Sequence, residues 1–293
     1  MIRSQRFQGG VFILCASAVV VSCLMLPRMG HSAELVVVAV LVLLLGVPHG
    51  ALDALFARRE YGTQSVLGWA VFGLLYVGLA GGVVAIWMVA PSAFLIGFLV
   101  ISVAHFSGDP GRGTWVFSRL FYGGAIIVLP SLWHQGEVAS LFSELAGPAA
   151  SGLVVPALHG LAVPWLISLT ICAAIEVRRD WQTGGELAVL GALAVIAPPL
   201  VAFAVFFCAM HSPRHILRTA IYAADIPRRL LVATGLAPMA IVLAAACAAW
   251  VWLDGVPMNA RIMQILFVGL AALTVPHMML VERVRMRGWV QAS

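Results

Sequence analysis

Long apolar runs separated by short polar connections dominate this chain. A membrane-spanning helix needs about 20 mostly apolar residues, and ten stretches approach or exceed that length: 9–27, 33–53, 66–89, 91–106, 115–133, 152–177, 182–198, 199–221, 231–253 and 261–281. The fourth and the seventh are short, and the pair Pro198–Pro199 either separates two spans or breaks one longer span. The pattern predicts an all-α, polytopic transmembrane helix bundle of eight to ten helices, ten being favoured, in a single integral-membrane domain over residues 1–293.

The composition supports a membrane protein and excludes several other classes. Of the 293 residues, 62% are hydrophobic and 10% are charged, whereas about a quarter of the residues of a soluble domain are charged. Soluble, disordered and nucleic-acid-binding proteins are therefore excluded. All 17 basic residues are Arg, so no Lys can form the Schiff base of a retinal-binding opsin. The five Cys show no CxxC spacing and are interpreted as small core residues.

The arginines predict the orientation in the membrane. With ten spans and a cytoplasmic N-terminus, 15 of the 17 Arg fall on the inner side, and only Arg28 and Arg261 fall outside. Cytoplasmic loops of membrane proteins carry an excess of Lys and Arg. We therefore expect both termini to be cytoplasmic, in a multi-pass protein of the cell inner (cytoplasmic) membrane.

Eight His are present, and the predicted spans separate them into two groups. His31 and His134 fall in outer loops, and His159 falls in the outer half of its helix. The other five fall near the inner ends of four even-numbered spans: His49, His105, His211, His215 and His277. The sequence thus predicts five imidazoles at one membrane depth.

The spacing around these His is typical of metal sites. His211 and His215 are four residues apart, about 6 Å along a helix and on one face, so that both can bind one metal ion. Asp53 follows His49 by four residues, and Asp109 follows His105 by four. A ligating His usually donates its second ring N–H to a carboxylate or a carbonyl, a role open to Asp53, Asp109 and Glu282. Prolines beside the His (Pro48, Pro213, Pro276) can bend the helices and turn the imidazoles inward.

Simpler explanations exist for each residue taken alone. A single His at a helix end is usually an interfacial polar residue, and the prolines can be ordinary kinks. The two Asp can pair with inner-loop arginines, namely Arg58, Arg59 and Arg112. Polar residues inside a membrane are costly, however, and usually mark function. Five His converging from four helices therefore favour a metal site.

Ligand chemistry and missing motifs restrict what such a metal can do. Nitrogen ligands suit Fe, Zn or Cu without choosing among them. The chain has no GxxxxGK[ST], GxGxxG or GxSxG motif, so nucleotide-driven chemistry and a serine nucleophile lack support. We expect the metal to carry the reaction, on a lipid-soluble substrate.

Four segments together resemble a known family. PHGALD at 48–53, HFSGD at 105–109, HSPRH at 211–215 and PHMMLVE at 276–282 look like the motifs of the bacteriorhodopsin-related Brp/Blh family of membrane-bound β-carotene 15,15′-dioxygenases, and the likeness extends over about 35–285. This resemblance implies an Fe(II) cofactor held by His49, His105, His211 and His215. His277 lies in a further family motif, as a fifth ligand or a substrate-positioning residue.

The resemblance also implies the reaction and its partners. O2 adds across the central double bond of β-carotene, which yields two molecules of all-trans-retinal; a microbial rhodopsin is a candidate acceptor of the product, and the lipid bilayer is the surrounding medium. Aromatic residues on helices that adjoin the His motifs are candidates for a substrate tunnel: Trp69, Phe94, Phe98, Phe106, Phe203, Phe206 and Phe207. More often such aromatic residues serve helix packing or lipid contact.

Two other functions compete with this hypothesis. A membrane di-iron hydroxylase or desaturase typically has about eight His in HxxxH and HxxHH clusters, whereas this chain has one HxxxH and no HH pair. A non-enzymatic haem carrier, or a metal or proton transporter, can also use His from separate helices. The predicted His depth, at one membrane face, differs from the midplane sites of transporters.

Overall fold

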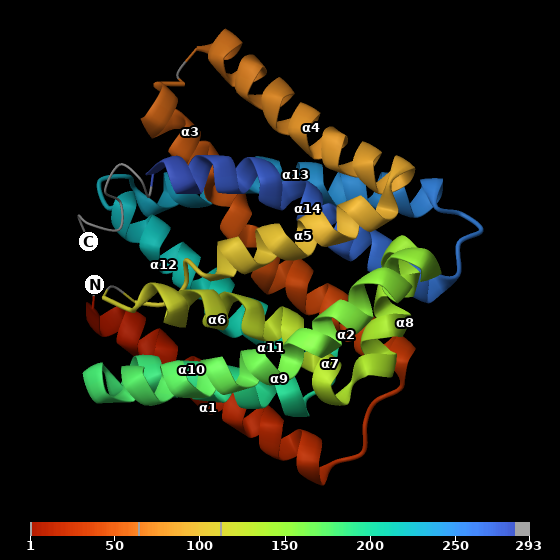
Figure 1. Cartoon of the computed structure of the whole chain (residues 1–293). Helices are drawn as coiled ribbons and strands as arrows, with labels where there is room; N and C mark the ends of the chain where they lie inside the picture. The colour runs from red at the N-terminus through yellow and green to blue at the C-terminus, as the bar shows by residue number, and fades with distance from the viewer. Residues whose placement is uncertain (1, 64, 112, 285–293) are drawn as a thin grey trace.

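The computed structural model describes residues 2–63, 65–111 and 113–284, and in this part of the chain every regular element is a helix (Figure 1). The α-helices are α1 (Ile2–Met25), α2 (His31–Leu41), α3 (Asp53–Tyr61), α4 (Val66–Val89), α5 (Pro91–Phe106), α6 (Val116–Val128), α7 (Pro130–Trp133), α8 (Gln135–Ala146), α9 (Pro148–Arg179), α10 (Trp181–Ile196), α11 (Pro199–Phe206), α12 (Ser212–Tyr222), α13 (Arg228–Trp252) and α14 (Met258–Val284). The predicted all-α helix bundle is confirmed.

Eight helical segments are long and apolar enough to cross a membrane. They are Ser4–Met25, His31–Glu60, Val66–Val89, Val116–Trp133, Pro148–Arg179, Pro199–Tyr222, Thr234–Trp252 and Met258–Val281. The two stretches that looked short in the sequence form shorter apolar helices, α5 and α10. Helix α10 ends at Ile196 and α11 begins at Pro199, so the proline pair marks a turn between two helices. The protein is a multi-pass membrane protein.

The start of α1 and the end of α14 lie on the same side of the bundle (Figure 1). An even number of membrane crossings requires this arrangement. It agrees with the expectation that both termini lie on one side, and the assignment of that side to the cytoplasm stays a prediction.

One helix, α8, was missed in the sequence. Residues 134–147, which were expected to form an outer loop, contain α8, whose Val138, Leu141 and Leu145 are buried at helical spacing. The indole of Trp87 donates to the Leu145 carbonyl at 2.9 Å, which ties α8 to α4. The segment is too polar and too short for a span. Burial of this narrow apolar face stabilises it as a helix.

The second span departs from regular α-helix around His49. A π-helical turn at Val42–Gly46 leads into a 3-10 segment at Val47–Leu52, and α3 continues to Tyr61. A second π-helical turn, Phe207–His211, joins α11 to α12. Such turns leave backbone carbonyls without their usual donors and are frequent at functional sites. His49 and His211 therefore lie at these irregular turns, within helical segments that continue to Glu60 and Tyr222, and their depth in the membrane stays a prediction.

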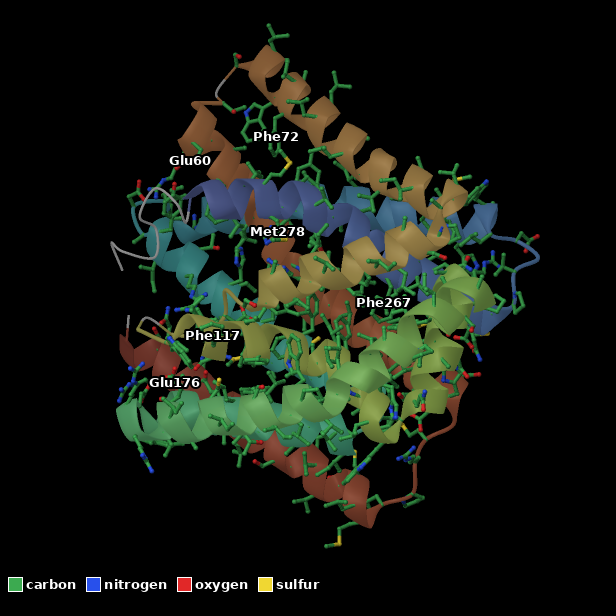
Figure 2. The ribbon with its side chains drawn as sticks, viewed as in Figure 1. Glu60, Phe72, Phe117, Glu176, Phe267 and Met278 are labelled. Carbon is green, nitrogen blue, oxygen red and sulfur yellow. The ribbon has the colours of Figure 1, made fainter. Side chains whose placement is uncertain are left out.

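The bundle has one large apolar core and a small second one. The large core takes buried residues from α1, α2, α5, α6, α8–α11 and α14. The small core consists of Phe56, Leu280 and Val281, against which α4 packs Phe72 and Tyr76. Figure 2 shows Phe72 between α4 and the rest of the bundle. The hydrophobic segments of α4 and α13 contribute no buried residue, so both present apolar surface to their surroundings, as expected in lipid.

Candidate metal centre

Five histidine rings from four separate parts of the chain meet inside the bundle. The ring centroid of His49 lies 5.0 Å from His211, 5.3 Å from His215 and 5.3 Å from His277. His105 lies 4.6 Å from His211 and 5.2 Å from His277, and His215 lies 4.9 Å from His277. Four of the rings are buried and His105 is partly buried. The five His residues therefore lie together, as the sequence predicted.

Several of the ring nitrogens are placed to bind one ion. Ligand atoms of His49, His105 and His277 all lie within 4.8 Å of one another. The Nδ1 atom of His49 donates to the Gly46 carbonyl at 2.5 Å, which leaves its Nε2 atom as the acceptor. The Nε2 atoms of His211 and His277 are buried and have no hydrogen-bond partner among the described residues. Buried polar atoms are normally paired, so these orphaned nitrogens fit a metal ion at the centre of the cluster.

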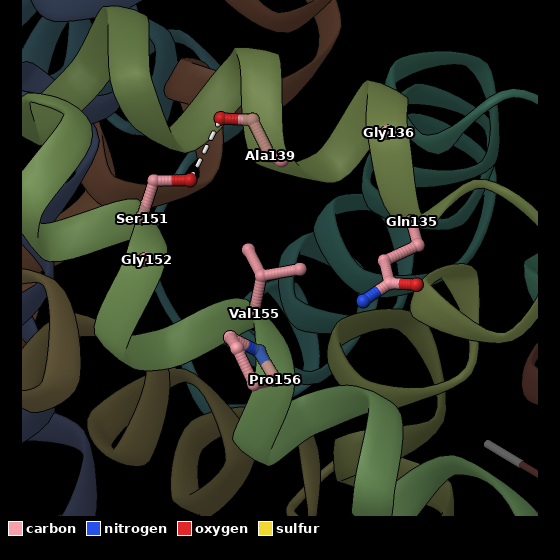
Figure 3. A pocket seen from close by; sticks show the side chains of 7 residues that line it. All are labelled: Gln135, Gly136, Ala139, Ser151, Gly152, Val155 and Pro156. Atoms are coloured by element: carbon pink, nitrogen blue, oxygen red, sulfur yellow. Dashed lines mark hydrogen bonds between the residues drawn. The ribbon is translucent and has the colours of Figure 1, made fainter.

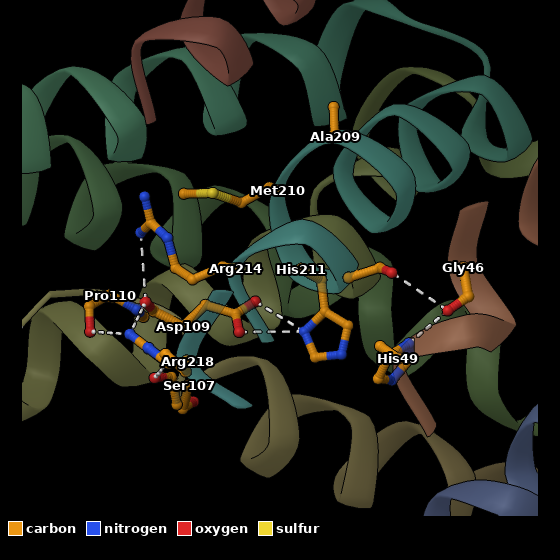
Figure 4. Close-up of polar contacts among 12 residues, drawn as sticks. Gly46, His49, Ser107, Asp109, Pro110, Ala209, Met210, His211, Arg214 and Arg218 are labelled. Atoms are coloured by element: carbon orange, nitrogen blue, oxygen red, sulfur yellow. Dashed lines mark hydrogen bonds and ion pairs between the residues drawn. The ribbon is translucent and has the colours of Figure 1, made fainter. Parts of the chain in front are cut away.

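Two buried carboxylates orient two of the rings, as Figure 4 shows for one of them. The Asp109 carboxylate accepts from His211 Nδ1 at 3.0 and 3.1 Å, and Asp53 Oδ1 accepts from His277 Nδ1 at 2.6 Å. Each bond fixes its ring so that Nε2 is the free nitrogen. Both Asp thus hold a His from a different helix rather than the His four residues before them.

Local backbone geometry explains why each Asp bonds a His from a different helix. The 3-10 segment has three residues per turn, so four residues place His49 and Asp53 about 120° apart around the axis. Helix α5 ends at Phe106, and Asp109 therefore lies in the turn beyond it. Sequence spacing predicted carboxylates near the site, but it could not identify which ring each one meets.

The simpler pairing of Asp53 with an inner-loop arginine does not occur for Arg59. Arg59 instead donates to the carbonyl of Tyr222 and to the carboxylate of Asp225. Asp225 lies outside the spans, and its hydrogen bond from Arg59 lowers the pKa of that carboxyl below its usual value. The charges of Asp53 and of Arg59 are therefore committed to different partners.

A buried charged network supports the turn that carries Asp109. Arg218 donates to the carbonyls of Gly108 and Asp109 at 2.9 and 2.7 Å, and Arg214 donates to the Asp109 carbonyl at 3.3 Å (Figure 4). Arg214 also forms a two-bond ion pair with Glu186, at 2.8 and 2.9 Å. The sequence had assigned both arginines to the inner-side charge excess, and the role of Glu186 had no signal in the sequence.

A side chain from α1 replaces a backbone hydrogen bond that is missing beside the second π-helical turn. Pro213 has no N–H, so the carbonyl of Ala209, four residues earlier, lacks its helical donor. Gln8 from α1 fills that place, since its Nε2 donates to the Ala209 carbonyl at 2.8 Å. Gln8 also accepts from Arg214 Nε at 2.9 Å. The backbone carbonyl left without its helical donor near His211 is thus paired with an amide 201 residues away in the sequence, which no local pattern reveals.

Gly46 allows a close approach between the two π-helical turns. A Cβ atom at Gly46 would lie 2.4 Å from a ring carbon of Phe207, and the Phe207 ring stacks on His211 with 5.3 Å between centroids. We expect Gly46→Ala to displace Phe207, to destabilise the protein by about 1–3 kcal/mol and to lower metal occupancy, measured by thermal unfolding and by metal analysis.

Gly50 provides the matched control for this prediction. It lies in the adjoining 3-10 segment, and a Cβ atom there meets nothing within 4 Å. Gly50→Ala should leave both measurements near the wild-type values. Equal behaviour of the two variants would mean that the contact between Gly46 and Phe207 does not support the site.

The proposed tunnel residues are unevenly placed around the cluster. Phe106 and Phe207 contact the His211 ring at 4.9 and 5.3 Å, and Phe206 lies 6.4 Å from it. Phe203 stacks on Phe207 at 5.2 Å. The rings of Phe94 and Phe98 stack on each other in the first half of α5. The ring of Trp69 contacts that of Phe72 on α4. Phe106, Phe206 and Phe207 therefore adjoin the histidine cluster, and the other aromatic residues pair with aromatic side chains.

The remaining polar candidates lie elsewhere. His31 bonds Glu144 at 3.2 Å, and His159 bonds the Ser131 carbonyl at 2.8 Å. His134, expected in an outer loop, is buried immediately before α8. The side chain of Glu282 lies outside the described residues. A surface hollow of about 370 Å³ between α8 and α9, lined by Gln135, Gly136, Ala139, Ser151, Gly152, Val155 and Pro156, contains no titratable side chain (Figure 3).

Known proteins are similar to this chain over most of its length. The family model described as "Beta-carotene 15,15'-dioxygenase" matches residues 40–284. A protein of that name from an uncultured marine bacterium, 66A03, is 31% identical over 261 residues, which cover 83% of this chain and 90% of the relative. A probable β-carotene 15,15′-dioxygenase, Blh, from Halobacterium salinarum is 29% identical over 240 residues, 72% of this chain and 68% of the relative. No solved structure matches. The chain belongs to the β-carotene 15,15′-dioxygenase family.

Proposed function

We propose that this chain cleaves β-carotene at its central 15,15′ double bond with O2 and releases two molecules of all-trans-retinal. The observation that carries the proposal is the buried five-histidine cluster, in a chain that belongs to a family named for this reaction. The reaction balances without a further reductant, because one C=C bond breaks and the two oxygen atoms of O2 form two aldehyde C=O bonds. The absence of a nucleotide motif in the sequence agrees with this balance.

An Fe(II) ion is the proposed cofactor, with His49, His105, His211 and His215 as ligands and His277 as a fifth ligand. Three features support this set: the nitrogen-only donors, the orphaned Nε2 atoms of His211 and His277, and the Asp-to-His bonds that are usual behind metal ligands. When bound, iron would supply the redox chemistry that lets O2 react with an alkene.

The side chains around the cluster have separate tasks in this proposal. Asp53 and Asp109 hold two rings in the tautomer that presents Nε2 inward. The rings of Phe106, Phe206 and Phe207 exclude water on one side and offer an apolar wall to a polyene. We propose Phe94, Phe98 and Phe203 as outer parts of the same wall.

A second metal is poorly supplied by this chain. The three His outside the cluster bond to Glu144, Ile196 and Ser131 and lie on other parts of the bundle. This observation disfavours the di-iron hydroxylase or desaturase. The predicted depth of the cluster, at one membrane face, differs from the midplane sites of transporters. Family membership also favours the enzyme.

The membrane setting defines the remaining partners. A β-carotene molecule dissolves in the bilayer, so a substrate path from lipid fits the largely apolar surface of the bundle. We place the protein in the cell inner membrane with both termini cytoplasmic, and we propose a microbial rhodopsin as the retinal acceptor.

Metal removal and replacement test the cofactor. Chelator-treated full-length protein in detergent micelles should leave β-carotene intact, and Fe(II) with O2 should restore retinal formation. Zn(II), which accepts similar nitrogen ligands but has no redox chemistry, should occupy the site without restoring activity. Retinal formation by demonstrably metal-free protein, or by the Zn(II) form, would contradict the proposal.

A further inference from the structure

The phenol of Tyr76 extends the hydrogen-bonded chain behind His277. Tyr76 OH donates to Asp53 Oδ2 at 2.9 Å, and Asp53 Oδ1 accepts from His277 Nδ1 at 2.6 Å. The phenol also lies 3.5 Å from the Leu273 carbonyl, a distance too long for a strong bond. One helix, α4, thereby connects through the Asp53 carboxylate to a ring of the metal centre on α14.

The position of Tyr76 is unusual for its helix. The hydrophobic segment of α4 contributes no buried residue, yet Tyr76 turns toward the small apolar core formed by Phe56, Leu280 and Val281. Phe72 packs on the same face, with its ring 5.7 Å from that of Tyr76. The phenol is thus held in a defined place on a helix that otherwise faces outward.

The two carboxylates of the site are supported in different ways. Asp109 lies in a turn whose backbone is held by Arg214 and Arg218. Asp53 is 3% exposed and starts α3, and its side chain is held by a donor on each oxygen. A carboxylate bonded at one oxygen can rotate about its Cβ–Cγ axis, whereas two donors on opposite oxygens fix its plane. The second donor, Tyr76, therefore determines the direction from which His277 is held.

We propose that Tyr76 is a positioning residue of the metal centre, which orients His277 through the Asp53 carboxylate. This inference rests on the proposed function only in taking His277 as a metal ligand. Nothing in the sequence pointed to Tyr76, which lies in a run of apolar residues 23 positions after Asp53.

Metal binding by the full-length apoprotein in micelles tests the inference without reference to catalysis. Co(II) is the probe, because its visible absorption bands report the geometry of its ligands. Loss of a residue that bonds a ligating His typically costs 10–100-fold in metal affinity, which is the effect expected of Asp53→Asn. For Tyr76→Phe, one bond further away, we expect a loss of about 3–10-fold and a shift of the Co(II) bands.

The double variant makes the test specific. If Tyr76 acts through Asp53, adding Tyr76→Phe to Asp53→Asn should weaken Co(II) binding little further, since the carboxylate it positions is already gone. Tyr222→Phe is the matched control. Its phenol donates to the carboxylate of Glu60 at 3.1 Å, whereas the phenol of Tyr76 donates to the carboxylate that holds His277. It should bind Co(II) like the wild type.

The outcomes separate this inference from the proposed function. Wild-type affinity and spectrum in Tyr76→Phe, or a loss that adds in full to that of Asp53→Asn, would overturn the role of Tyr76. Wild-type protein that binds Co(II) with these effects but forms no retinal with Fe(II) would leave Tyr76 as a positioning residue and would contradict the proposed reaction.

Discussion

Replacing His211 with Ala should abolish retinal formation. The His211 ring bonds Asp109 on one side and contacts the rings of His49 and His105 on the other. Its Nε2 atom is buried without a hydrogen-bond partner among the described residues, so its place in the site is explained by a metal ion. Since loss of an outer partner of a ligand already costs 10–100-fold, loss of the ligand should lower the rate of retinal formation by more than about 100-fold.

The measurement is retinal per unit of folded protein, with metal content determined on the same preparation. His31→Ala is the control, because His31 is an exposed histidine whose partner is Glu144. It should retain wild-type activity. Retained turnover in His211→Ala would remove this residue from the ligand set, whatever the family of the chain.

Replacing Glu186 with Gln should destabilise the bundle strongly. The side chains of Glu186 and Arg214 are each 4% exposed, so the substitution leaves a buried guanidinium without its counter-charge. Breaking a buried ion pair by removing one partner typically costs 3–5 kcal/mol. We expect the free energy of unfolding in mixed micelles to fall by about that amount. Because Arg214 also contacts the Asp109 carbonyl, metal occupancy should fall in parallel.

An exposed pair on the same side of the protein provides the comparison. Arg6 and Asp180 are 3.4 Å apart, and the Arg6 side chain is 58% exposed. Exposed pairs contribute less than about 1 kcal/mol, so Arg6→Gln should change the unfolding free energy little. A Glu186→Gln variant as stable as Arg6→Gln would mean that the buried pair does not hold the α10–α12 contact.

The fold was largely predictable because hydrophobicity alone determines which segments enter a membrane. The apolar blocks gave the helical regions, and the proline pair correctly raised the possibility of a boundary between α10 and α11. Helix α8 was missed because its apolar face is narrow and its other residues are polar. The continuation of the second span to Glu60 was missed because α3 contains Arg58 and Arg59, which are typical of a loop at the end of a span.

The site was predictable as a set of residues and not as a set of contacts. Five His could be grouped because intramembrane imidazoles are costly and fell at similar predicted depths. The partners of Asp53 and Asp109 depend on a 3-10 segment and on the end of α5, which hydrophobic periodicity does not report. Gln8, Tyr76 and Glu186 reach the site across long sequence separations, and only the packed structure brings them there.

Pigment analysis of membranes from β-carotene-producing cells that express the wild-type chain tests the central claim most directly. The account predicts loss of β-carotene and formation of two molecules of retinal for each molecule consumed, in an amount that depends on O2. Full-length, folded and iron-loaded protein that leaves β-carotene intact, or that cuts it into unequal fragments, would contradict it.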